Sequence, residues 1–227
     1  MQDVPLDPKP ADRLPVSDAV RVQILATEHW SLLATRSMVW NELFSRASMF
    51  ITVLSASIVA LALVAQATDF DDGFRNFALL VLPVTLLLGI GTLIRLGDAM
   101  TEDVWLVMGM NRLRHAYIDL APDLEPYFMT GHHDDFESIL KTRGPRRHMG
   151  PSQILAATPT IVAIIDSVLA GVIAALLAGF VNDDPLLTTT IGVTTTIAVA
   201  AVVLIGILPL RGIKVFMGSL TPRFPRA

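Results

Sequence analysis

Small and hydroxyl-bearing side chains recur every three or four residues along residues 45–66. An α-helix turns about 100° per residue, so alternating steps of three and four keep such residues on one face. Within the apolar segment this stripe consists of Ser45, Ser48, Thr52, Ser55, Val59, Ala62 and Gln66. The same rhythm continues toward the N-terminus through Asn41, Met38, Ala34, Ser31 and Thr27.

The stripe has two interpretations, because lipid alone would not select small and polar residues on one helix face. Small residues let a neighbouring helix approach closely, and their hydroxyls then bond across the interface or back to their own helix. Alternatively, several copies surround a water-filled pathway lined by the stripe, with Val59 at a dewetting constriction. A mean spacing of about 3.5 residues favours a left-handed bundle in both cases.

Asp166 is the only acidic residue in any of the four apolar segments described below. A carboxylate in a membrane span costs roughly 2.5–3.5 kcal/mol on insertion scales and must face protein or water. Arg95, at the end of the second apolar segment, would lie at nearly the depth of Asp166 and could approach it. The open alternatives are a structural ion pair, a neutral acid bonded to a neighbour, and a group on an ion or proton pathway.

No residue set typical of catalysis or metal binding stands out. The chain has no cysteine, and a Gly-rich phosphate loop, a Ser/His/Asp set and an HExxH motif are all missing. His132 and His133 are adjacent and have only His148 as a further partner, and adjacent ligands rarely reach one ion. Asp134 or Asp135 as a helix N-cap, with Glu137 in the first turn, explains the run better. We therefore predict no metal, no cofactor and no enzymatic activity.

A basic cluster precedes the third apolar segment and consists of Lys141, Arg143, Arg146 and Arg147. Lysine and arginine at this position are typical of contacts with anionic lipid headgroups and of a topology signal. We expect anionic lipids at the cytoplasmic face as partners, and no nucleic acid.

Four apolar segments give the chain of 227 residues a mean hydropathy of +0.57. Each exceeds the roughly 20 residues that a helix needs to cross a 30 Å hydrocarbon core. The predicted spans are residues 47–67, 74–94, 158–181 and 186–210. Short connections join the first to the second and the third to the fourth, which predicts two transmembrane hairpins.

The distribution of lysine and arginine predicts the orientation of these spans. Five precede the first span, seven lie in the central loop and four follow the fourth span, whereas only Arg75 lies at the opposite ends of the spans. Because basic loops stay in the cytoplasm, both termini and the central loop are expected there, in the cell membrane.

The predicted fold is all-α, with long cytoplasmic extensions of the first hairpin. Ser17 is the expected N-cap of a helix that enters the first span without a break, and the second span continues into a helix over residues 97–120. The predicted organisation is a disordered leader (1–16), the extended hairpin (17–120), a connector (121–157) with a short helix near residues 136–141, the second hairpin (158–210) and a basic tail (211–227).

The segment MNRLRHAYIDLAPDLEPYF, followed by GHHDD, resembles an uncharacterised family of actinobacterial four-span membrane proteins. That resemblance implies membrane location and no specific activity. The order of helix, two spans and helix over residues 17–120 is also similar in architecture to the SLATT-type membrane effectors of bacterial defence systems, which are proposed pore formers.

Two functional hypotheses follow from the sequence. The first is a homo-oligomeric membrane protein that forms an ion or small-solute pathway lined by the first span. The second is a membrane-anchored scaffold or sensor whose cytoplasmic helices bind a partner. Four spans leave little room for a pathway inside one protomer, so the first hypothesis requires several copies.

Overall fold

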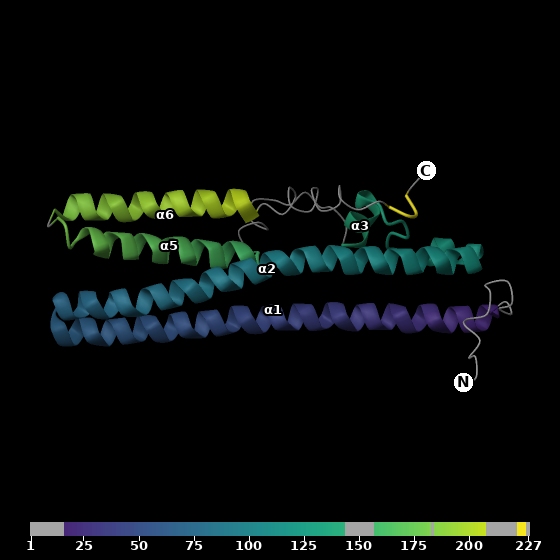
Figure 1. The fold of residues 1–227 in the computed structure, drawn as a ribbon, viewed down its shortest axis with the longest axis horizontal. Coiled ribbons are helices and arrows are strands. Elements are labelled where there is room, and N and C mark those ends of the chain that lie inside the picture. The colour runs from purple at the N-terminus through teal and green to yellow at the C-terminus, as the bar shows by residue number, and fades with distance from the viewer. Residues whose placement is uncertain (1–15, 144–156, 183, 208–221, 226–227) are drawn as a thin grey trace, which may run out of the picture.

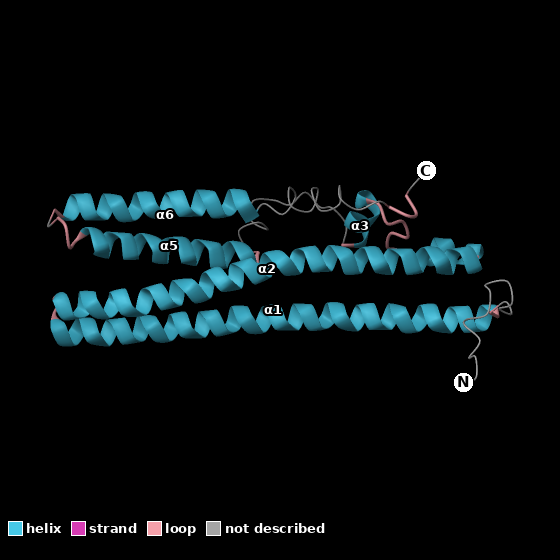
Figure 2. Cartoon of the chain, viewed as in Figure 1, coloured by secondary structure: helices cyan, strands magenta, loops and turns pink. Residues whose placement is uncertain are grey.

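The computed structural model describes residues 16–143, 157–182, 184–207 and 222–225, and within these residues it is helical and contains no strand (Figure 2). Four helices are long and apolar enough to cross a membrane, which confirms an all-α chain with four candidate spans. They are α1 (Asp18–Thr68), α2 (Asp72–Leu120), α5 (Thr158–Ala178) and α6 (Pro185–Ile207). Two shorter elements follow α2, a 3-10 helix η2 (Pro122–Tyr127) and the helix α3 (Phe136–Thr142).

Helices α1 and α2 run antiparallel along each other for most of their length (Figure 1). Asp69 and Phe70 end α1 with positive φ angles of 48° and 62°, a left-handed conformation that aspartate tolerates better than most residues. The side chain of Asp71 then accepts a 3.1 Å hydrogen bond from the amide of Phe74 and so caps the start of α2. Helix α2 continues through Pro83 without a break.

Helices α5 and α6 form a second antiparallel pair, and α5 lies against α2 (Figure 1). Small residues allow α5 and α6 to approach closely, since a Cβ atom on Gly171 would lie 2.6 Å from the carbonyl oxygen of Gly192. Helix α5 ends at Ala178, three residues before the predicted end of its span.

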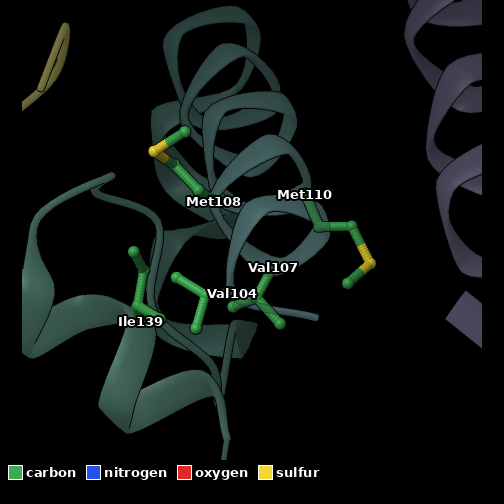
Figure 3. Close-up of a cluster of buried hydrophobic side chains, with 5 residues drawn as sticks. All are labelled: Val104, Val107, Met108, Met110 and Ile139. Carbon is green, nitrogen blue, oxygen red and sulfur yellow. The ribbon is translucent and has the colours of Figure 1, made fainter. Parts of the chain in front are cut away.

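Three apolar clusters hold these helices together. One joins α1, α2 and α5 around Phe50 and Val162, and another joins α2 and α5 around Leu82 and Leu169. The third attaches α3 to α2, and Figure 3 shows Ile139 of α3 beside valines of α2. Its buried members are Val104, Val107, Met108, Met110 and Ile139.

The short helix predicted near residues 136–141 is confirmed as α3, and of the two aspartates predicted as alternative caps, Asp134 and Asp135, the second is the cap. Asp135 is the N-cap, and its side chain accepts a 2.7 Å hydrogen bond from the amide of Ser138. Ser17 occupies the predicted N-cap position of α1, but its side chain makes no capping hydrogen bond.

Candidate functional site

The stripe of small and polar residues on α1 is exposed along its whole length. Residues of α1 that pack on α2, such as Leu43, Phe50 and Ser57, lie roughly 150° away around the helix. Val59, at the middle of the stripe, is 59% exposed. Within the part of the chain that the structure describes, no other helix covers this face.

Two hydroxyl groups of the stripe, those of Thr52 and Ser55, donate hydrogen bonds within their own helix. Thr52 donates to the carbonyl of Ser48 at 2.9 Å, and Ser55 donates to the carbonyl of Ile51 at 2.8 Å. On the side that faces α2, the hydroxyl of Ser57 likewise lies 2.8 Å from a carbonyl of its own helix, that of Val53. It also lies 3.0 Å from the hydroxyl of Thr85, a buried hydrogen-bond contact between the two helices. The stripe is therefore a narrow polar surface, and little free energy is lost when it is placed against either a neighbouring helix or water.

Before residue 47, α1 has apolar residues on two faces, of which one packs along α2 and the other is exposed. One face, including Leu25, Leu32 and Val39, is partly covered by packing along α2, and Leu43 is buried. The other face stays exposed in the single chain, with Trp30 and Phe44 exposed by 71% and 57%. An exposed apolar patch of this kind indicates a binding surface for protein or lipid.

Asp166 is buried on α5 and has no hydrogen-bond partner within the described residues. The residue is only 2% exposed, and neither carboxyl oxygen has a donor within reach. The carboxyl group lies over Gly89 of α2, where a Cβ atom would come within 2.6 Å of Oδ2 and overlap Oδ1. Gly89 is thus the residue that makes room for the acid.

Arg95 does not approach Asp166, so the ion pair considered from the sequence is not formed. Its guanidinium group instead bonds Glu42 of α1 at 2.9 Å and Glu102 of α2 at 2.8 Å. Hydrogen bonds from Arg95 and from Arg46 lower the pKa of Glu42 to about 2. Glu42 and Glu102, which lie outside the predicted spans, thus supply the negative charge that Arg95 would otherwise have found in Asp166.

Asp103 is a buried junction that no pattern in the sequence indicated. Its carboxylate accepts hydrogen bonds from Arg36 of α1 at 2.6 Å and from Arg143, just after α3, at 2.6 Å, and the indole of Trp40 lies 3.3 Å away. Burial acts to raise the pKa of Asp103, but the two arginines hold it below its ordinary value. The junction fastens α1, α2 and the end of α3 to one another.

Asp134, expected as a possible helix cap, instead binds the C-terminal segment. Its carboxylate accepts hydrogen bonds from the backbone amides of Arg223 and Phe224 at 2.8 and 2.9 Å, and from the side chain of Arg112 at 2.8 Å. Burial acts to raise the pKa of Asp134, but these donors together lower it. The ring of Phe224 lies 4.6 Å from that of His115.

His115 of α2 comes close to the histidine pair, although the sequence offered only His148 as a partner. The ring of His133 lies 5.5 Å from His115 and 4.3 Å from His132. Within the described residues no three histidine, aspartate or glutamate side chains are arranged to hold a metal ion. His148 lies outside those residues.

Of the basic cluster, Lys141 and Arg143 are described, whereas Arg146 and Arg147 lie outside the described residues. Lys141 is exposed, but Arg143 is engaged by Asp103 and by the carbonyl oxygen of Met100. The predicted contact with lipid headgroups therefore depends on the remaining three residues.

No family model, no curated protein and no solved structure matches this chain.

Proposed function

We propose that the chain is a multi-pass membrane protein whose copies associate through the stripe on α1 and line an ion or small-solute pathway with it. The observation that carries this proposal is the exposure of every stripe residue on the side of α1 that faces away from α2. Small-residue packing needs a second helix, and no described helix of the same chain supplies it. A neighbouring copy is the partner with matching chemistry, because its own stripe has the same small residues.

Exposure of the stripe also supports the pathway. The stripe runs through the whole apolar segment of α1, from Ser45 to Gln66, a length of about 30 Å at 1.5 Å per residue. Hydroxyls line it at intervals, and Val59 is the one bulky apolar member, the kind of residue that closes a narrow pore by excluding water. Several copies of α1 around one axis would form such a pathway. In this arrangement the extended parts of α1 and α2, both termini and all basic residues except Arg75 lie in the cytoplasm.

Because the chain contains no cysteine, a single introduced cysteine is the only thiol in each variant, and disulfide crosslinking can test the association. Single-cysteine variants Ser48→Cys and Ser55→Cys should form disulfide-linked dimers in liposomes on mild oxidation. Leu80→Cys on α2 is the matched control, because Leu80 is 69% exposed but lies outside the stripe. Equal crosslinking at all three positions, or none at either stripe position, would contradict the association.

A second measurement separates a pathway from close packing. A charged, membrane-impermeant thiol reagent should modify Ser55→Cys and block solute flux from the same liposomes if water fills the stripe. If Ser55→Cys forms crosslinks but resists the reagent and the liposomes show no flux, the stripe is an assembly surface and the pathway is wrong.

The alternative function is a scaffold or sensor, and the exposed face around Trp30 and Phe44 favours it. Replacement of both residues by serine should leave stripe crosslinking intact. If the double variant retains flux but loses binding of a defined soluble partner, this face serves partner recognition rather than assembly.

A further inference from the structure

Asp166 has no charged neighbour anywhere along the apolar helices. Helix α1 has no ionisable residue between Arg46 and Asp69, and α2 has none between Arg75 and Arg95. Helix α5 has no other ionisable residue, and α6 has none between Pro185 and Ile207. The nearest cation along α2 is Arg95, which Glu42 and Glu102 already neutralise.

Polar groups near Asp166 on the two helices that enclose it are also occupied. The hydroxyl of Ser167, next in sequence, donates to the carbonyl of Ala163 at 2.7 Å. On α2, the hydroxyl of Thr92, nearly one turn from Gly89, donates to the carbonyl of Leu88 at 2.8 Å. Thr85, one turn from Gly89 in the other direction, bonds to Ser57 and to the carbonyl of Val81.

Apolar clusters flank the acid along α5. Val162, one turn before Asp166, is buried with Phe50 and Leu96, and Leu169, nearly one turn after it, is buried with Ala78 and Leu82. Among the described residues, an ionised carboxylate at this place would have neither a counter-ion nor a hydrogen-bond donor, which is among the costliest arrangements in a protein interior.

We propose that Asp166 is a proton-binding site between α2 and α5, in which the neutral acid is the bound state and ionisation weakens the contact between the two helices. A proton is the ligand that the geometry allows. At 2% exposure, with the carboxyl group against the backbone of Gly89, there is no room for a hydrated cation, whereas a proton adds no volume. The site would make packing of α5 on α2 respond to pH.

This inference does not depend on the α1 pathway, because Asp166 lies at a different contact. Crosslinking of the α1 stripe could fail while the proton site stands, and the reverse also holds. If the α1 pathway and the proton site both exist, proton release at Asp166 would change the contact of α5 with α2. Because α2 also packs on α1, that change would reach the helices around α1.

Infrared spectroscopy of the full chain in phosphatidylcholine liposomes tests the protonation state directly. At neutral pH the protein should show the C=O stretching band of an undissociated carboxylic acid, and Asp166→Asn should remove it. Asp72→Asn is the matched control, because the side chain of Asp72 is 88% exposed and should contribute no such band. A spectrum that Asp166→Asn leaves unchanged at neutral pH would overturn the proposal.

Thermal unfolding tests the consequence for packing. Asparagine has nearly the size and hydrogen-bonding groups of the neutral acid but cannot ionise. The melting temperature of the wild-type protein should therefore fall relative to that of Asp166→Asn as the pH rises, and the difference should widen steadily. Asp72→Asn should track the wild type. A constant difference between wild type and Asp166→Asn at every pH would contradict proton binding at this contact.

Discussion

Replacement of Gly89 by alanine tests the packing of Asp166 on α2 most sharply, because α2 supplies its own control two residues away. A Cβ atom at position 89 would overlap Oδ1 of Asp166 and lie 2.5 Å from its Cγ atom. At Gly91, nothing lies within 4 Å of the same atom. Both substitutions are glycine to alanine in the interior of one helix, so the gain in helix propensity is shared and cancels in the comparison.

Two opposing effects, helix propensity and overpacking, set the expected difference in stability. Alanine in place of glycine stabilises a helix interior by roughly 0.5–1 kcal/mol, and this gain is all that Gly91→Ala should show. Overpacking costs typically about 1–3 kcal/mol, so Gly89→Ala should be less stable than Gly91→Ala by about that amount. For a chain of this length the difference corresponds to about 2–4 °C in melting temperature per kcal/mol.

Thermal unfolding of both variants in the same liposomes or detergent measures the difference. A second pair of measurements isolates the contact, since in an Asp166→Ala background the carboxyl group is gone and Gly89→Ala should lose its penalty. A clash between position 89 and Asp166 is refuted if Gly89→Ala is as stable as Gly91→Ala, or if the penalty of Gly89→Ala is the same with and without the carboxyl group.

Three further predictions concern the other contacts. Asp103→Asn should lower stability by about 2–4 kcal/mol in thermal unfolding, because it removes the buried negative charge that two arginines share. Glu102→Gln, at an exposed pair, should cost under about 1 kcal/mol in the same measurement. Since the folded pKa of Asp134 lies below the ordinary 3.8, its stabilisation is present above that pH and is lost as the pH falls through the folded value. Measured relative to the intrinsic exchange rate at each pH, the Arg223 and Phe224 amides should therefore be weakly protected in Asp134→Asn at pH 7, and should lose their protection in the wild type only in acid. Equal protection in the two proteins at pH 7 would contradict the contact. Gly171→Ala should separate α5 from α6 and lower the melting temperature, because its Cβ atom would lie 2.6 Å from a backbone oxygen, and Gly97→Ala, which meets nothing within 4 Å, should not.

The sequence was sufficient for features that depend on neighbouring residues along the chain. Hydropathy over about 20 residues predicts α5 and α6 within a few residues, because a helix in lipid satisfies its own backbone groups. The cap of α3 is likewise a contact over three residues, although the sequence left Asp134 and Asp135 as alternatives and the structure decided for Asp135. The stripe on α1 follows from helical periodicity alone, and its exposure away from α2 could not be read from that periodicity.

Only the tertiary structure decided which charged and polar groups meet. Arg95 was expected near Asp166 by depth, yet it binds Glu42, 53 residues earlier, because the antiparallel packing of α1 on α2 brings that carboxylate to it. Asp103 joins Arg36 and Arg143, and Asp134 binds amides about 90 residues later, through contacts that have no local signal. The sequence by itself determined that Asp166 must lie in an apolar helix. The structure decided that it faces Gly89 and has no hydrogen-bond partner in the part of the chain that is described, because the alignment of α5 on α2 depends on side-chain packing between helices and not on either helix alone.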